Sequence, residues 1–121
     1  MIDNFEKYTA ELSELEQKKV VPEVAAILRG RVGKWNAITN KQIVGLLRAR
    51  YIETDEPRVR KVVHFLRETG GVRWLVASSV GYYVAQTLGE MEAYVATLRS
   101  RENSIRAVRE AIEKQMDGTL F

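Results

Sequence analysis

The residues best suited to do chemistry lie between positions 58 and 68. Projecting this segment on a helix at 100° per residue separates two faces, an apolar one with Val59, Val62, Val63 and Leu66 and a polar one with Arg60, Lys61, His64 and Arg67. Arginine and lysine side chains bind phosphate oxygens, and arginine can bridge guanine through two hydrogen bonds. We expect Arg60, Lys61 and His64 to face base edges. Arg58, near the helix start, and Arg67, near its end, are expected to contact phosphates.

A basic stripe of this kind is often only a solvated helix face. Against that interpretation, Glu68 is the only acid on this face apart from those at the helix start, whereas ordinary surface helices tend to alternate charge. Outside this segment, the further candidates for contact with DNA are Lys41, Arg73, Ser78 and Ser79. The pattern favours binding of double-stranded DNA.

The sequence contains few residues that could support catalysis or bind a metal ion. The chain has no cysteine and a single histidine, which excludes disulfides, thiolate sites and a multi-histidine metal site. His64 lacks a serine or a paired carboxylate at a spacing that would make it a general base. The acids Glu53, Asp55 and Glu56 beside Pro57 are explained as the capping end of a helix. We therefore expect no enzyme activity, no metal, no cofactor and no small-molecule substrate.

The positive charge is concentrated in the middle of the chain. Residues 22 to 87 contain eleven Lys and Arg against five acids, a net charge of +6, whereas residues 1 to 21 carry −2 and residues 88 to 121 carry −1. No stretch of the sequence has the length and apolar character of a membrane span, and the first residues do not read as a secretory signal. The expected location is the cytoplasm of a bacterial host cell, and no membrane partner is expected.

Two helices are expected before residue 34. Residues 3 to 19 place Phe5, Tyr8, Leu12 and Leu15 on one apolar stripe. Pro22 is expected to open a second helix that buries Val24, Ala25, Ile27 and Leu28, and Gly30 and Gly33 would end it. Residues 34 to 38 are predicted to form a short extended link.

Two further helices are marked by their start signals. Thr39 and Gln42 match a capping box, so a helix should start at Asn40 and bury Ile43, Val44, Leu46 and Leu47 before it ends near Arg50. Asp55 followed by Pro57 predicts a helix from 56 to about 69, which Gly70 would terminate. Residues 72 to 78 and 82 to 87 have strand composition and are joined by a turn at 79 to 81. The aromatic residues Trp74, Tyr82, Tyr83 and Trp35 are expected to pack rather than to stack on bases.

The remainder of the chain predicts one long helix. Thr87 and Glu90 form another capping box, and no breaker follows until residues 117 and 118, about 28 residues or ~42 Å later. Met91, Leu98, Ile105 and Ile112 repeat every seven residues, and Tyr94 and Val108 lie three positions after members of that series. Arg101 and Gln115 interrupt the second series. We expect self-association through this series, and the alternative is burial of the series against the chain's own N-terminal helix.

The fold class expected from these elements is mainly α with a small β-hairpin. A winged helix-turn-helix domain at 22–87 would follow an N-terminal amphipathic helix at 1–21 and precede a long C-terminal helix at 88–121 that serves as an oligomerisation element. The seam residues expected to form the dimer are Met91, Tyr94, Leu98, Ile105, Val108 and Ile112, together with Phe5, Tyr8, Leu12 and Leu15 of the N-terminal helix.

Several short runs resemble a family of small phage and prophage winged-helix proteins. They are Ala37-Ile38-Thr39, Val59-Arg60-Lys61-Val62-Val63, Leu66-Arg67 and Ala77-Ser78-Ser79-Val80-Gly81-Tyr82-Tyr83, followed by the helical run from 90 to 101. The resemblance covers roughly residues 37 to 112. It implies a DNA-associated role in phage replication, packaging or transcription. The long connection at 50 to 57 and the uncharged hairpin tip depart from the family pattern.

Two functions from different classes follow. The first is a dimeric DNA-binding protein that places the helix at 56 to 69 in the major groove. The second is a winged-helix module for protein–protein interaction or assembly, which would show no significant affinity for DNA.

Overall fold

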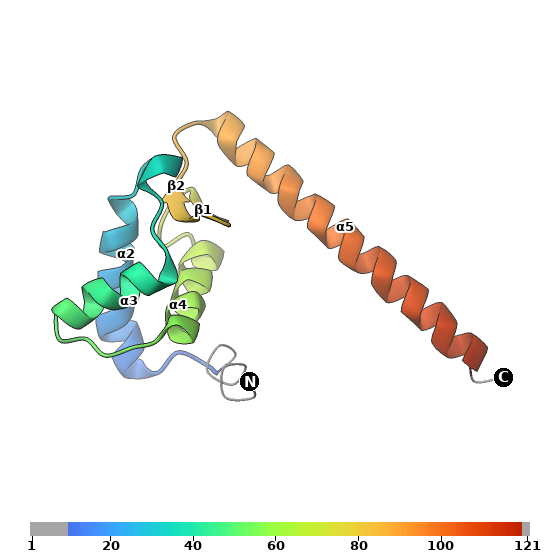
Figure 1. Ribbon diagram of the computed structural model, residues 1–121, viewed down its shortest axis with the longest axis horizontal. Coiled ribbons are helices and arrows are strands. Elements are labelled where there is room, and N and C mark those ends of the chain that lie inside the picture. Colours follow the sequence, from blue (N-terminus) through green and yellow to red (C-terminus); the bar gives the residue numbers. More distant parts are fainter. Residues whose placement is uncertain (1–9, 120–121) are drawn as a thin grey trace. The chain divides into compact units, whose positions relative to one another are not determined.

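The computed structural model describes residues 10–119, and it divides the chain into two compact units, Met1–Gln86 and Thr87–Phe121. Among the described residues, the first unit contains three α-helices and one two-stranded antiparallel hairpin, and the second contains one long helix (Figure 1). The fold is therefore mainly helical with a small hairpin and a long C-terminal helix, as expected. None of the helices in the described residues is both long and apolar enough to cross a membrane.

The helix predicted at 3–19 is not helical at residues 10 to 13, and the helical segment that follows is continuous through Pro22. Residues 10 to 13 are not helical, and Ser13 and Glu16 form a capping box in which each side chain accepts a hydrogen bond from the other's backbone N–H, at 3.1 and 2.9 Å. A π-helical segment, Glu16–Val20, runs directly into α2, Val21–Arg29. Proline cannot donate a backbone hydrogen bond, and the wider π turn before it accommodates that loss without a break. α2 therefore begins beside Pro22, as expected, but it follows the preceding helical segment without a break.

The predicted N-terminal stripe does not persist as one surface. Phe5 and Tyr8 lie outside the described residues. Leu12 is 9% exposed and belongs to the hydrophobic core, whereas Leu15 is 65% exposed. The two leucines therefore do not share one apolar face, because the chain is not helical at Leu12.

The next two helices have the predicted bounds. α3, Asn40–Ala49, begins with the Thr39–Gln42 capping box, and α4, Glu56–Thr69, begins where the Asp55 side chain accepts a hydrogen bond from the Arg58 N–H at 3.1 Å. Gly70 ends α4 with a φ of 74°. Leu46 was expected in the core but is 42% exposed. The link before α3 is a 3-10 turn, Lys34–Asn36, rather than an extended segment.

The hairpin is shorter than the strand composition predicted. β1, Leu75–Ser78, pairs with β2, Gly81–Val84, and the residues from 71 to 74 form turns in which Trp74 has a φ of 62°. Ile38 adds one more pairing, since its N–H and C=O bond the C=O and N–H of Tyr82 at 2.9 and 2.8 Å. Gly81, with a φ of 125°, permits this contact because a Cβ at that position would lie 2.6 Å from the Ile38 oxygen.

The core lies between α2, α3, α4 and the hairpin. α4 contacts both α2 and α3, and α2 also contacts β2 (Figure 1). The predicted apolar face of α4 is confirmed, and the largest fully buried side chains of the unit are Leu28, Ile38, Ile43, Leu47, Val24, Val59, Val62 and Val63. Burying this face of α4 orients its opposite face outward.

α5, Leu88–Thr119, begins where the Thr87 hydroxyl accepts a hydrogen bond from the Glu90 N–H at 3.2 Å. It continues through residues 117 and 118, which were expected to break it. An isolated glycine lowers helix stability by only about 1 kcal/mol and does not by itself stop a helix.

Candidate nucleic-acid interface

The outer face of α4 carries the basic residues that the sequence pattern selected. Arg60 and His64 are exposed, and Lys61 and Arg67 are partly buried. Arg60 and Lys61 form no ion pair with any residue that the structure describes. His64 Nε2 lies 3.3 Å from a Glu68 carboxylate oxygen, an ion pair only when the imidazole is protonated. The positive charge of this face therefore comes mainly from its arginines and lysine.

Arg58 has a different role from the one its position suggested. Its guanidinium donates to both carboxylate oxygens of Glu16, at 2.9 and 2.7 Å, and to the backbone carbonyls of Ala10 and Glu11, at 2.9 and 3.1 Å. The side chains of the ion pair are only 13% and 17% exposed. Arg58 therefore fastens the N-terminal segment to the start of α4, and this geometry does not fit the expected phosphate contact.

The ion pair between Arg58 and Glu16 shifts the pKa of both groups. The hydrogen bonds from Arg58 lower the pKa of Glu16, although partial burial opposes that shift. The same hydrogen bonds raise the pKa of Arg58. Both groups are therefore held in their charged forms. The helix start at Ser13 could have been found in the sequence, because Ser13 and Glu16 match the capping-box pattern.

The N-terminal segment borders the basic face. A small hollow of about 170 Å³ lies between Glu11, Leu12 and Gln17 on one side and Lys61, His64, Phe65 and Glu68 on the other. The segment that Arg58 holds thus covers one flank of α4 near Lys61. Arg60 and Arg67 are on the other flank in the helical projection.

The candidates outside α4 differ in their availability. Lys41 is exposed on α3, and Ser79 is exposed at the hairpin tip. The Ser78 hydroxyl donates to the Gly81 carbonyl at 2.9 Å and accepts from the Val80 N–H at 3.3 Å, so it is occupied within the turn. The Arg73 guanidinium lies 5.4 Å from the centre of the Trp74 ring, a cation–π contact at the base of the hairpin.

The aromatic residues divide into two groups. Tyr82 is 9% exposed, and its hydroxyl donates to Asn40 Oδ1 at 2.8 Å, so it packs as expected. Trp35 was expected to pack but is 86% exposed, because it lies in the 3-10 turn rather than in an extended link. Tyr51, at the end of α3, is 96% exposed and has a φ of 63°. Composition gave no signal for the exposure of either residue.

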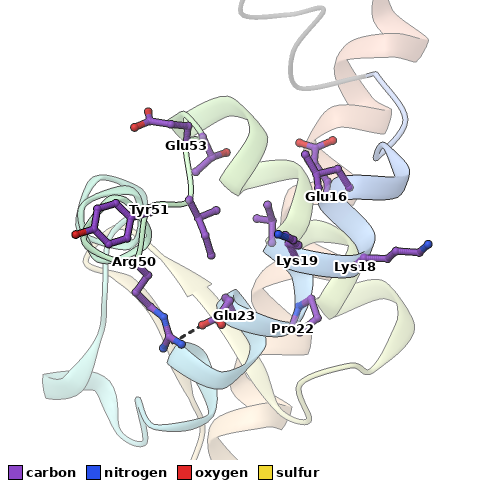
Figure 2. Close-up of a pocket in the computed structure, with 12 residues that line it drawn as sticks. Glu16, Lys18, Lys19, Pro22, Glu23, Arg50, Tyr51 and Glu53 are labelled. Carbon is purple, nitrogen blue, oxygen red and sulfur yellow. Dashed lines mark ion pairs between the residues drawn. The ribbon is translucent and has the colours of Figure 1, made fainter.

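A cleft of about 750 Å³ lies beside Tyr51, between the first helix and residues 50 to 54. Arg50 reaches across it to Glu23, with 3.2 Å between Nη1 and Oε2 (Figure 2). Lys18 points away from the other labelled residues and pairs with Glu14 at 2.7 Å. Basic and acidic side chains therefore compensate each other around this cleft, in contrast to the outer face of α4.

The residues expected to form a dimer fall into three groups. Phe5 and Tyr8 are outside the described residues, and Leu12 is buried in the hydrophobic core. On α5, Leu98, Ile105, Val108 and Ile112 are exposed, and Met91 and Tyr94 are partly buried. The apolar series of α5 thus remains exposed, whereas of the two described residues of the N-terminal stripe Leu12 is buried and Leu15 is exposed.

Chemically, the outer face of α4 offers hydrogen-bond donors and positive charge. In the described part of the chain, no three side chains of the types His, Cys, Asp or Glu are grouped closely enough to hold a metal ion. No protein-family model matches this sequence, and no significant match was found among curated proteins or solved structures.

Proposed function

We propose that residues 10–86 form a winged helix-turn-helix domain that binds double-stranded DNA through α4. The order of elements supports this assignment. In such a domain a helix and a short strand precede the helix-turn-helix pair, and a hairpin follows it. Here α2, the Ile38 pairing segment, α3, α4 and the β1–β2 hairpin follow one another in that order.

The observation that carries the proposal is the uncompensated charge of Arg60 and Lys61. In this unit Arg58, Arg50 and Lys18 are each paired with a glutamate, whereas Lys41 and Arg48, like Arg60 and Lys61, have no ion pair within the described residues. Arg60 and Lys61 have no such partner within the described residues, although they lie on a helix whose other face is fully buried. A polyanion would supply the missing negative charge, and the release of its counterions would favour binding.

The proposed roles follow from exposure. Arg60, Lys61 and His64 would reach base edges in the major groove, with Arg67 and Lys41 on phosphates. Arg73 and Ser79 would be the contacts of the hairpin with the flanking backbone. Arg58 and Ser78 are left out, because their polar atoms are already engaged within the fold.

The wider role rests on the resemblance to small phage and prophage winged-helix proteins. Under this proposal the chain is a binding protein and not an enzyme, and it acts in phage transcription, replication or packaging in the cytoplasm of a bacterial host. Its exposed α5 series would join two copies, so that two DNA-binding units act together.

The test is a fluorescence-anisotropy titration of a labelled duplex of mixed sequence across a series of salt concentrations. We expect log K to fall linearly with log salt, at a slope that corresponds to several neutralised phosphates. The variant with Arg60→Gln and Lys61→Gln should bind at least tenfold more weakly. The matched control, Lys18→Gln with Lys19→Gln, removes the same charge beside the cleft. Equal losses in both variants would mean that only net charge matters.

A second candidate function is a protein-docking module without significant affinity for DNA. The observation that favours it is the exposure of Trp35 and Tyr51, because large exposed aromatic side chains are characteristic of protein interfaces. The two functions separate in the same titration. Negligible binding at low salt by a folded protein would reject the DNA proposal and leave the docking module.

A further inference from the structure

The most extended apolar surface in the described residues belongs to α5. Its seven-residue series contains Met91, Leu98, Ile105 and Ile112, and a second series three residues later contains Tyr94, Arg101, Val108 and Gln115. Ile105 is 70% exposed and Val108 is 59% exposed. We propose that a second copy of this chain covers this surface, with its α5 antiparallel and the pairing centred on residue 103. The inference deepens the proposed self-association and rests on it.

The position of the series determines the pairing. In an antiparallel pair of helices, members of the first series face members of the second. The two series together run from residue 91 to residue 115. Every residue of one series therefore has a partner from the other series only if the two helices cross their midpoints at residue 103. Leu98 then faces Val108 of the second copy, and Ile112 faces Tyr94. Shifting the centre by half a heptad moves the outermost members beyond their partners.

The two polar members of the seam favour the antiparallel direction. In a parallel pair, Arg101 would face Arg101 of the second copy, which places like charges inside the seam. In the antiparallel pair, Arg101 faces Ile105, and Gln115 faces Met91. Each polar side chain then lies against an aliphatic one, along which its stem can pack while its polar end remains in water.

The residues flanking the seam are complementary in the same arrangement. Glu102 of one helix lies on the same edge as Arg109 of the other, about 7.5 Å away along the axis, and the symmetry repeats this pair. Within its own helix Glu102 also lies 3.8 Å from Arg106, and Arg109 lies 2.8 Å from Glu113. Glu102 and Arg109 are exposed, at 71% and 58%. Val95 meets Met116 on the same edge, and these side chains are 46% and 60% exposed. In a parallel pair, Val95 would instead face Glu90.

The opposite edge of the seam carries small side chains. Thr97 lies almost level with Ala111 of the second copy, and Ser104 lies near its own counterpart at the centre. Small residues on this edge let the two backbones approach. The antiparallel direction also separates the starts of the two helices, because Leu88 of one copy lies about 45 Å along the axis from Leu88 of the other, at 1.5 Å per residue.

The absence of cysteine makes a cross-linking test clean. Full-length Thr97→Cys and Ala111→Cys variants are treated with a short bis-maleimide, separately and after mixing and equilibration. We expect a cross-linked dimer in the mixture and little in either variant alone, because like positions are about 20 Å apart along the axis. Cross-linking of Thr97→Cys with itself would indicate a parallel pair and overturn the proposal.

A pair of charge reversals provides the second test. In a dimer of Glu102→Arg alone, or of Arg109→Glu alone, residues 102 and 109 of opposite copies carry like charges at both contacts. A dimer of one Glu102→Arg copy and one Arg109→Glu copy has opposite charges at both contacts. We expect the mixture to associate about tenfold more tightly than either variant alone in sedimentation experiments. Any loss of helix stability caused by a substitution is the same in the mixture and in the separate variants, so it does not affect the comparison. Equal association of the mixture and the separate variants would overturn the proposed pairing.

Both tests are made without DNA. A chain that cross-links as expected but binds no duplex would refute the DNA proposal and leave the pairing intact. A strict monomer at high concentration that still binds duplex would refute the pairing alone.

Discussion

Arg58 is the side chain that fastens the N-terminal residues to α4. Four of its hydrogen bonds go to Glu16, Ala10 and Glu11, and the ion pair is largely shielded from water. Charged hydrogen bonds of this kind contribute more than those between exposed ions. The residue that seemed suited to a phosphate is thus part of the fold, which limits the candidate interface to the residues that follow it.

Replacing Arg58 should therefore lower stability more than replacing its neighbour on the outer face. We expect Arg58→Ala to reduce the free energy of unfolding by about 1–3 kcal/mol, because Glu16 and two carbonyls lose their donor. Arg60→Ala, at an exposed and unpaired position, should change it by about 0.5 kcal/mol or less. Urea unfolding at neutral pH measures both. Similar losses of unfolding free energy in the two variants would mean that the hydrogen bonds of Arg58 contribute little to stability.

The lowered pKa of Glu16 predicts a dependence of stability on pH. A carboxyl whose pKa is lower in the folded state stabilises the fold at pH values above its unfolded pKa, about 4.3. That contribution is lost as the pH falls through the folded pKa. The stability difference between the wild type and Glu16→Gln should therefore be constant near neutral pH and shrink below about pH 4. A difference that stays constant in acid would contradict this role of Glu16.

Tyr51 occupies a position that glycine usually fills. The N–H of Ile52 bonds the Leu47 carbonyl, and the N–H of Tyr51 bonds the Arg48 carbonyl, both at 2.9 Å, so α3 ends in a Schellman motif. A side chain at a φ of 63° is strained. Tyr51→Gly should therefore raise the free energy of unfolding by about 0.5–1 kcal/mol. Tyr51→Ala keeps the Cβ and should give no comparable gain, which thermal or urea unfolding can check.

At the scale of the elements, the helix start signals were the most reliable guide. Thr39 and Asp55 each place an acceptor beside free N–H groups, a local interaction that the sequence reveals directly. Pro22 lies in the first turn of α2 as expected, but its presence did not predict that the preceding turn would join α2 without a break, because that depends on how the turn adjusts. The Ile38–Tyr82 pairing was not predicted either, since it joins residues 44 positions apart.

That pairing makes Gly81 a test of how the hairpin is attached. A Cβ there would lie 2.6 Å from the Ile38 oxygen and would also be strained at a φ of 125°. We expect Gly81→Ala to lower the free energy of unfolding by about 2–4 kcal/mol. The control is Gly45→Ala on α3, where a Cβ meets nothing within 4 Å and should stabilise the helix by about 0.5–1 kcal/mol. A loss of stability in both variants would indicate a general intolerance of alanine.

For the whole molecule, the division of charge between the two units matters. Residues 22 to 87 carry the net positive charge, whereas residues 88 to 121 are nearly neutral and present an apolar series. The sequence pattern predicted this division, because composition and a seven-residue repeat are both visible without coordinates. It did not predict that Leu12 is buried in the core, so this residue is not part of a surface for self-association.

If two units bind one DNA molecule, disrupting the α5 pair should weaken binding to long duplexes without unfolding the domain. Val108→Glu places an acid in the seam opposite Leu98 of the second copy, and Ala107→Glu places the same acid on the outward face of the helix. We expect Val108→Glu to be monomeric in sedimentation and to bind a long duplex about 10²-fold more weakly, because its two DNA-binding units are no longer linked and each must bind separately. On a duplex long enough for one unit only, the two variants should bind alike. Equal affinity of both variants for the long duplex would show that each copy binds independently, and DNA recognition would then not depend on the seam at all.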